Sequence, residues 1–246
     1  MKKLVGFITS SLPENNFTID LALAMKEAGV DILELGIPFS DPVADGPIIE
    51  KASLMALQNG FKLKDLFEVS EKIAPHIDTL WMGYMNPFYK YGMEAFLKQG
   101  VKCGIKGAII PDLPFEEALR YKDIFKQYNQ TIIDFVAPTT PKDRIKKLIN
   151  HSELFIYLVA YAGITGSGAK EDLSEIISYI KQITNTPLYI GFGVDSHTAY
   201  EKSRDVDGVI VGSAFVKHLI DDSLNYNEKI TNITTIAKEI KEKINL

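Results

Sequence analysis

Eight short apolar segments recur along the chain, and a stretch with helical spacing of its apolar residues follows each of them. The segments are rich in β-branched and large apolar residues and are too short for helices, which is typical of β-strands. Their apolar runs are continuous rather than alternating, as expected for parallel strands that are covered on both faces. We therefore predict strands at residues 4–9, 30–35, 79–84, 107–110, 131–136, 154–160, 187–191 and 208–211.

The helices predicted between these strands complete eight strand–helix units. They cover residues 18–28, 48–58, 63–74, 93–102, 115–127, 141–150, 173–184 and most of 213–244, with a short helix near residue 196. Eight such units match the about 250 residues of a typical (β/α)8 barrel. An open, doubly wound sheet uses the same alternation and is the main alternative. Because no linker or change of composition divides the chain, we predict a single α/β domain over residues 1–246, a TIM barrel.

The charge and the cysteine content exclude several classes of protein. A net charge of −5 without any basic run argues against nucleic acid as the main partner. Cys103 is the only cysteine, so neither an internal disulfide nor a cysteine metal cluster is possible. The apolar run after Lys3 is shorter than the about 7–15 residues of a signal-peptide core, and no segment approaches the about 18 of a membrane span. We expect a cytoplasmic protein that does not act at a membrane.

A carboxylate interrupts the apolar strand predicted at residues 30–35. Glu34 stands among Ile32, Leu33 and Leu35, where an ionised side chain is costly to bury. Burial raises the pKa of a carboxyl group toward neutrality, where the group can both donate and accept a proton. A structural Glu held by an ion pair or by backbone donors is the alternative, since the sequence does not say which face of the strand is interior. We predict that Glu34 is the residue that carries the chemistry.

Two more carboxylates, Asp41 and Asp45, follow in the next loop on either side of Pro42. Either Asp taken alone is more typical of a turn. Asp45 gains weight because Gly46 and Pro47 lead from it into a predicted helix, and because its loop directly follows the Glu34 strand. A carboxylate in such a loop can reach over a substrate and accept a hydrogen bond from it.

Glycine-containing loops follow three successive strands, at residues 163–168, 191–193 and 212–213. Glycine allows the backbone to approach closely, so that several N–H groups can point at one anion. Ser213 also opens a helix, whose N-terminus favours a phosphate. The loops after strands seven and eight form the usual phosphate site of such barrels. We predict that these loops bind a phosphate group.

The predicted chemistry is acid–base work by carboxylates, without a metal or a covalent cofactor. No predicted strand contains a lysine, which argues against a Schiff base, and the four histidines are not spaced as metal ligands. Large side chains near the same ends of the predicted strands suggest a wide, flat pocket, although each taken alone is more often a core residue. They are Phe7, Met82, Tyr84, Tyr157 and Phe192.

The segment 33–47, Leu-Glu-Leu-Gly-Ile-Pro-Phe-Ser-Asp-Pro-Val-Ala-Asp-Gly-Pro, resembles the signature of the tryptophan synthase alpha chain family. The loops at 163–166, 191–193 and 212–213 follow in the family's order, so the resemblance covers nearly the whole chain. It implies a (β/α)8 barrel that cleaves indole-3-glycerol phosphate into indole and glyceraldehyde 3-phosphate in a retro-aldol reaction. It further implies that Glu34 is the acid/base and that Asp45 holds the indole N–H as positive charge develops there.

The resemblance also implies the other site residues and a partner. The indole pocket would contain Phe7, Met82, Tyr84, Ile109, Val136, Tyr157 and Phe192, and the phosphate site Gly166, Gly193, Gly212 and Ser213. Thr165 would contact the catalytic Asp when the active site closes. The implied partner is a beta chain, in an alpha2beta2 heterotetramer, that carries pyridoxal phosphate and receives the indole. This chain would have no cofactor of its own.

Three alternatives stay open at this point. The chain could be a catalytically idle subunit that binds a phosphate ligand and activates its partner, although the presence of both Glu34 and Asp45 speaks against this. It could be a stand-alone lyase that releases indole without a beta chain. It could also be another phosphate-binding barrel, such as a phosphoribosyl isomerase or an indoleglycerol-phosphate synthase. The missing strand-end lysine argues against the synthase.

Overall fold

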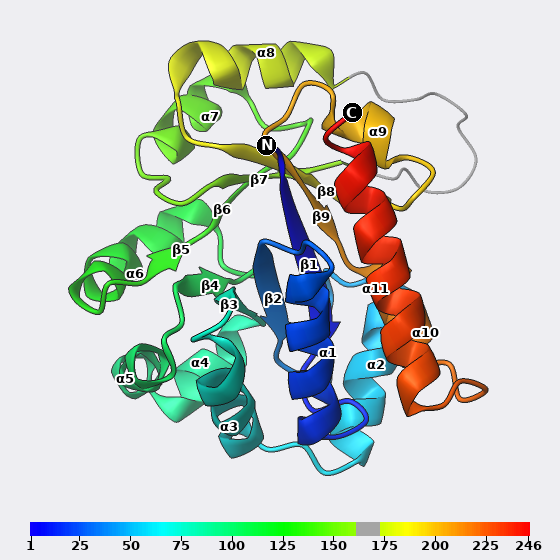
Figure 1. Ribbon diagram of the computed structural model, residues 1–246. Coiled ribbons are helices and arrows are strands. Elements are labelled where there is room, and N and C mark those ends of the chain that lie inside the picture. Colours follow the sequence, from blue (N-terminus) through cyan, green and yellow to red (C-terminus); the bar gives the residue numbers. More distant parts are fainter. Residues whose placement is uncertain (161–172) are drawn as a thin grey trace.

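Nine parallel strands form one sheet in the computed structural model, which describes residues 1–160 and 173–246 (Figure 1). The order of the strands is β5-β4-β3-β2-β1-β9-β8-β7-β6. Their bounds are β1 (Lys3–Thr9), β2 (Ile32–Gly36), β3 (Asp78–Met82), β4 (Gly107–Ile109), β5 (Thr131–Ile132), β6 (Asp134–Val136), β7 (Ile156–Val159), β8 (Leu188–Gly191) and β9 (Gly208–Val211).

The sheet closes on itself through residues 131–136. β5 pairs with β4 and β6 pairs with β7, yet only Ile133 separates β5 from β6 along the chain. The backbone N–H of Ile133 still donates to the carbonyl of Ala108, at 3.0 Å. β5 and β6 are therefore two halves of one strand that is tilted so that each half faces a different neighbour. The prediction of a (β/α)8 barrel is confirmed.

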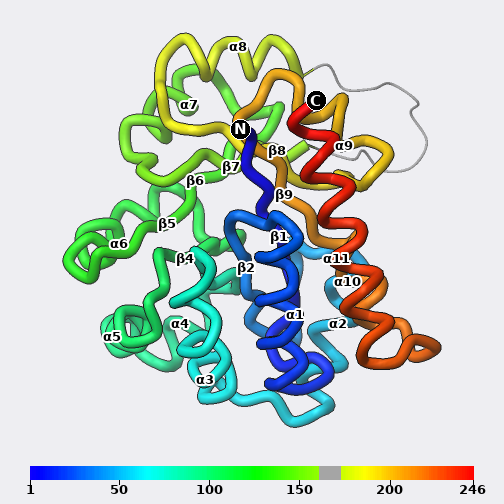
Figure 2. Tube along the Cα trace, viewed as in Figure 1, coloured from blue at the N-terminus to red at the C-terminus, as the bar shows by residue number. Residues whose placement is uncertain are grey.

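Helices lie around the outside of the strands, as Figures 1 and 2 show. In the described part of the chain they are α1 (Asn15–Glu27), α2 (Pro47–Gln58), α3 (Leu63–Ile73), α4 (Met85–Tyr91), α5 (Met93–Cys103), α6 (Phe115–Gln127), α7 (Lys142–Ile149), α8 (Ser174–Ile183), α9 (Ala199–Ser203), α10 (Ser213–Leu219) and α11 (Tyr226–Lys243). Most of these bounds lie within three residues of those predicted from the sequence.

Two helical features differ from the prediction. The sequence analysis does not predict α4, which holds Pro87 in its first turn, where a missing N–H removes no helical hydrogen bond. The helical sequence over 213–244 forms two helices, because Asn225 caps a new one. Its side chain accepts from the N–H groups of Asn227 and Glu228, and the Glu228 carboxylate accepts from the N–H of Asn225.

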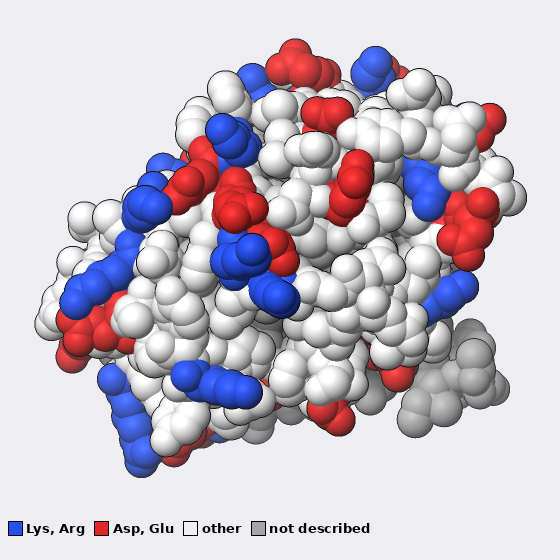
Figure 3. Space-filling view, turned by 90° about the horizontal axis from the view of Figure 1, so that it is seen from below, with Lys and Arg blue, Asp and Glu red and all other residues white. Residues whose placement is uncertain are grey.

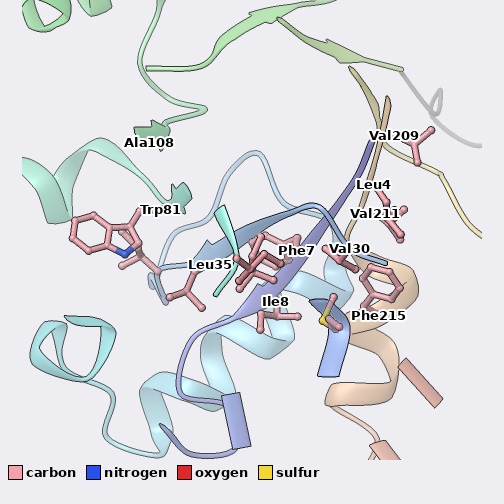
Figure 4. Close-up of a cluster of buried hydrophobic side chains, with 14 of the residues drawn as sticks. Leu4, Phe7, Ile8, Val30, Leu35, Trp81, Ala108, Val209, Val211 and Phe215 are labelled. Carbon is pink, nitrogen blue, oxygen red and sulfur yellow. The ribbon is translucent and has the colours of Figure 1, made fainter. Parts of the chain in front are cut away.

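Alternate residues of each strand face either the barrel interior or the surrounding helices. Val5, Ile32 and Leu80 belong to an inner cluster of buried side chains. Leu4, Leu33 and many others pack in the outer layer between barrel and helices, part of which Figure 4 shows. On β2, the interior face is therefore the one that carries Ile32, Glu34 and Gly36. This settles the face of Glu34, which the sequence leaves open.

Both ends of the described chain lie together at one end of the barrel (Figure 2). The backbone N–H of Lys2 donates to the Asn245 side chain at 2.8 Å, and the Lys241 ammonium donates to the carbonyl of Lys2 at 2.9 Å. On the face seen in Figure 3, basic and acidic side chains are interspersed. Within residues 1–160 and 173–246, no helix is long and apolar enough to cross a membrane.

A buried ion pair ties α6 to the barrel wall. The Lys122 ammonium donates to both carboxylate oxygens of Asp134, at 2.9 and 2.7 Å, and to the carbonyl of His151 at 3.1 Å. The Ser152 hydroxyl also donates to Asp134, at 2.7 Å. Asp134 is only 4% exposed, so without its counter-ion its charge is poorly solvated.

We expect Lys122→Met to lower the free energy of unfolding by about 2 kcal/mol, because the buried carboxylate loses two charge-assisted hydrogen bonds from a partly exposed lysine. Lys126→Met, in an exposed position on the same helix, is the matched control. Urea unfolding of the three proteins at pH 7 measures the effect. Equal midpoints for Lys122→Met and Lys126→Met would contradict the expectation.

Candidate active site

A cavity of about 860 Å³ opens at the carboxyl end of the barrel strands. Its lining includes the last residues of three strands, Met82 of β3, Ile109 of β4 and Val159 of β7, together with the loops that follow β2, β8 and β9. Active sites of (β/α)8 barrels lie at this end, because the loops after the strands converge there. The cavity therefore stands where the fold places chemistry.

Glu34 lies on the wall of this cavity with its side chain almost fully buried. Its neighbours in register are Phe7 on β1 and Leu80 on β3, so the carboxyl group stands between apolar side chains. Glu34 is 3% exposed, and among the described residues no group forms a hydrogen bond with its Oε1 atom. Burial, and then the charge of Asp45, raises the pKa of Glu34 to about 8. Within residues 1–160 and 173–246, no ion pair and no backbone donor to Glu34 supports the alternative of a structural Glu.

Asp45 faces the same cavity from the loop between β2 and α2. The pKa of its carboxyl group is raised to about 6, mainly by burial. A hydrogen bond with the Tyr84 hydroxyl lowers this pKa, and the charge of Glu50 raises it. The Tyr84 hydroxyl also accepts a hydrogen bond from the backbone N–H of Ala44, at 3.0 Å. The Tyr84 ring stacks on Phe39, with 5.3 Å between the ring centroids. Tyr84 thus holds the Asp45 loop in place.

Aromatic side chains form the wall beside Glu34. Tyr157 lies 5.0 Å from Phe135 and 6.4 Å from Phe192 between ring centroids. Burial and the nearby Glu34 and Asp45 carboxylates raise the pKa of Tyr157 well above its usual value, so its hydroxyl keeps its proton. Gly191 makes room for this side chain, since a Cβ there would stand 2.4 Å from the Tyr157 hydroxyl oxygen. The wall is aromatic, with one hydroxyl group, and the Phe135 and Phe192 rings are tilted by 37° and 64° to the Tyr157 ring.

Most of the residues singled out from the sequence meet in this one cavity. It is lined by Phe7, Glu34, Asp45, Met82, Ile109, Tyr157, Phe192, Gly193, Gly212 and Ser213. Two of the others lie elsewhere. Tyr84 is 2% exposed and stands behind the Asp45 loop, and Val136 packs in the outer layer. Thr165 and Gly166, with the rest of the loop at 163–168, lie outside the described residues.

Several lining residues are absent from the sequence-based site, including Phe135, Ile49, Ile210 and Lys217. Phe135 is the instructive case, because the resemblance points to its neighbour Val136. Side chains alternate across a strand, so an error of one residue in the register selects a residue on the opposite face of the strand. The alternation of Ile133 and Phe135 with the outward-facing Ile132 and Val136 is the signal that could have found it.

The turn after β8 and the segment after β9 bring backbone N–H groups to the cavity. Phe192 and Gly193 both have positive φ, +73° and +63°, and Gly193, Gly212 and Ser213 line the cavity. Consecutive N–H groups in such a turn form a concave site suited to an anion. Among the described residues, no three His, Cys, Asp or Glu side chains are grouped as a metal site. The arrangement suits proton transfer on a flat substrate that carries an anionic end.

Comparisons with known proteins point in one direction. A sequence model of the family described as "Tryptophan synthase alpha chain" matches residues 1–245. The tryptophan synthase alpha chain of Wolinella succinogenes is 57% identical over 246 residues, which cover 100% of this chain and 96% of that protein. The tryptophan synthase alpha chain of Thermoanaerobacter sp. (strain X514) is 41% identical over 249 residues, which cover 98% of this chain and 93% of that protein.

Solved structures agree with the sequence comparisons. Tryptophan synthase subunit alpha from Campylobacter jejuni is similar with a TM-score of 0.86 and 34% identity, covering 96% of this chain and 95% of that chain. A ligand-free tryptophan synthase from M. tuberculosis is similar with a TM-score of 0.88 and 28% identity, covering 100% of this chain and 94% of that chain. The fold of this chain therefore has counterparts of known structure that cover nearly its whole length.

Proposed function

The chain belongs to the tryptophan synthase alpha chain family, and from this premise we propose that it is a carbon–carbon lyase that cleaves indole-3-glycerol phosphate into indole and glyceraldehyde 3-phosphate. The observation that carries the proposal is Glu34, a buried carboxyl group with a pKa of about 8 on the wall of a cavity with aromatic side chains. At neutral pH such a group holds a proton and can give it up.

In this proposal Glu34 donates one proton of the reaction and accepts the other. Its carboxyl group gives a proton to C3 of the indole ring, which then can accept the electrons of the bond to the glycerol chain. The resulting carboxylate takes the proton of the adjacent hydroxyl group, the C–C bond breaks, and the hydroxyl carbon becomes the aldehyde. The bonding electrons return to the ring as indole forms. Glu34 ends the cycle protonated, as it began.

Asp45 stabilises the charge that appears during this step. Protonation of C3 places positive charge on the ring nitrogen, and the N–H group then donates a stronger hydrogen bond to a carboxylate. Asp45 lines the same cavity as Glu34. The two carboxyl groups are close enough for the charge of Asp45 to raise the pKa of Glu34. Stabilisation of developing charge lowers the barrier rather than strengthening substrate binding alone.

The glycine loops hold the phosphate end of the substrate in this proposal. Gly193, Gly212 and Ser213 line the cavity from the loops after β8 and β9, and two of them are glycines that allow close backbone approach. The aromatic wall of Phe135, Tyr157 and Phe192 can contact the faces and edges of an indole ring. A substrate with an aromatic ring at one end and a phosphate at the other fits this division.

The family implies a tryptophan synthase beta chain as partner. We propose an alpha2beta2 assembly in which the beta chain carries pyridoxal phosphate and converts the released indole, while this chain works without a cofactor of its own. The catalytically idle subunit is not favoured, because Glu34 and Asp45 both line the cavity with raised pKa values.

Indole release from indole-3-glycerol phosphate, measured with and without a beta chain, tests the proposed function. We expect slow release by the chain alone and a strong increase when the partner is added, because partner binding assembles the closed site. High turnover without the partner would favour a stand-alone lyase. No release in either mixture would reject the lyase activity.

A further inference from the structure

Lys202 reaches from α9 back to the turn that follows β8. Its ammonium nitrogen donates to the carbonyl oxygen of Phe192 at 2.7 Å and to that of Gly193 at 2.9 Å. The Thr198 hydroxyl donates to the same Gly193 carbonyl at 3.0 Å. Two successive carbonyl groups are thus fixed from one side, by side chains one helical turn apart.

The turn needs such support. Phe192 has a φ of +73°, a conformation that costs free energy for a residue with a side chain, and Gly193 follows it at +63°. A backbone in this region persists when surrounding groups hold it. Lys202 and Thr198 are the side chains that hold it here, through the carbonyl oxygens.

Fixing the two carbonyls also fixes the next two N–H groups. In a trans peptide the C=O and the following N–H point in opposite directions within one plane. The peptide from Phe192 to Gly193 therefore directs the Gly193 N–H away from Lys202, and the next peptide does the same for Val194. Within the described residues neither N–H has a hydrogen-bond acceptor, and both residues line the cavity. Two unpaired N–H donors in succession form an anion site.

The ammonium charge acts on the same two donors. A cation on a carbonyl oxygen polarises the whole peptide unit, which makes its N–H group a stronger donor. The Lys202 side chain is partly buried, and its two hydrogen bonds to the turn are exposed, so water screens part of this effect. Asp195, the nearest acidic residue in sequence to the turn, also lines the cavity, and its charge acts on Lys202. Its Oδ1 accepts from the N–H groups of His197 and Thr198, which offsets part of that charge.

We propose that Lys202 is a positioning residue for the phosphate end of the substrate: it locks the Phe192–Gly193 turn and strengthens the Gly193 and Val194 N–H groups that bind the anion. The inference rests on the proposed function, in that the substrate carries a phosphate bound at this turn. Lys202 itself does not contact the reacting atoms.

Titration of the protein with sn-glycerol 3-phosphate, which has the phosphate but no indole, tests this role. We expect Lys202→Met, which keeps the length of the side chain, to weaken binding by about tenfold. Lys202→Arg, whose guanidinium can reach both carbonyls, should restore most of the affinity. Lys238→Met, an exposed position on α11, is the matched control for the loss of one positive charge.

Indole binding separates positioning from a general structural effect. For Lys202→Met we expect indole to bind as in the wild type, and the KM for indole-3-glycerol phosphate to rise while kcat stays within about twofold, the pattern of lost uniform binding. Parallel loss of indole and glycerol phosphate binding, with a lower melting temperature, would show a merely structural role and overturn the inference. If Lys202→Met does not fold, Lys202→Gln, which keeps an N–H donor without the charge, takes its place.

The outcomes distinguish this inference from the proposed function. If the folded wild-type protein does not bind glycerol phosphate, the proposed phosphate site is rejected, and with it the role of Lys202. If the wild type binds it and Lys202→Met binds it equally well, the phosphate site stands and the role of Lys202 is overturned. Equal weakening in Lys202→Met and Lys238→Met would assign the effect to net charge, which also overturns it.

Discussion

Glu34→Gln is expected to lower kcat for indole release by about 10²- to 10⁴-fold, the range typical of losing a general acid–base. Glutamine has nearly the shape of the protonated carboxyl group but cannot transfer its proton. The substrate should still bind, so the loss should fall on kcat rather than on KM. Release of indole from indole-3-glycerol phosphate, measured in the presence of the beta chain, gives both constants.

The matched control is Glu27→Gln, an exposed carboxylate at the end of α1 with 78% of its side chain accessible. It should leave kcat unchanged. Glu34→Gln should also bind sn-glycerol 3-phosphate as the wild type does, because the glycine loops are untouched. A kcat within about tenfold of the wild type would show that Glu34 is not the acid–base and would reduce it to a wall residue.

The second large effect is the dependence of stability on pH that Glu34 introduces. Its pKa is raised from 4.5 to about 8 on folding. Below pH 4.5 both states hold the proton and there is no penalty. Between pH 4.5 and 8 the unfolded chain releases the proton while the folded chain retains it, so the free energy of unfolding falls by up to about 1.4 kcal/mol per pH unit. Above pH 8 the penalty no longer grows.

Urea unfolding of the wild type and Glu34→Gln at pH 5, 6, 7 and 8 measures this dependence. Gln does not titrate, so the difference between the two proteins isolates Glu34 from Asp45, whose raised pKa acts in the same direction between pH 3.8 and about 6. We expect Glu34→Gln to become the more stable protein by a few kcal/mol as the pH rises toward 8. A difference that does not change with pH would mean that the carboxyl group is not desolvated.

The alternation of apolar and helical segments predicts the barrel, because eight repeated units leave few ways to cover parallel strands on both faces. It does not predict the break at Ile133, where a tilted strand changes partners, since tilt depends on the closed ring. The short α4 is missed because Pro87 suggests a loop when its place in the first turn is unknown.

The carboxylates of the site follow from the sequence more readily than its walls do. A charged residue inside an apolar strand, as Glu34 is, stands out wherever it lies. Whether Phe135 or Val136 faces the cavity depends on the register of the strand, and the role of Tyr84 depends on where the Asp45 loop folds back. The cytoplasmic location, the single-domain organisation and the absence of a cofactor in this chain stay predictions.

Gly36 and Phe7 lie on neighbouring strands, and a Cβ on Gly36 would stand 2.5 Å from the Phe7 ring. The two positions therefore share one volume beside Glu34, and neither can grow unless the other shrinks. A change in the size of the pocket at this point therefore needs substitutions at both positions. A larger residue at Gly36 alone would overpack the site, and a smaller residue at Phe7 alone would leave a cavity. Related chains that bind a different ring should differ at both positions together.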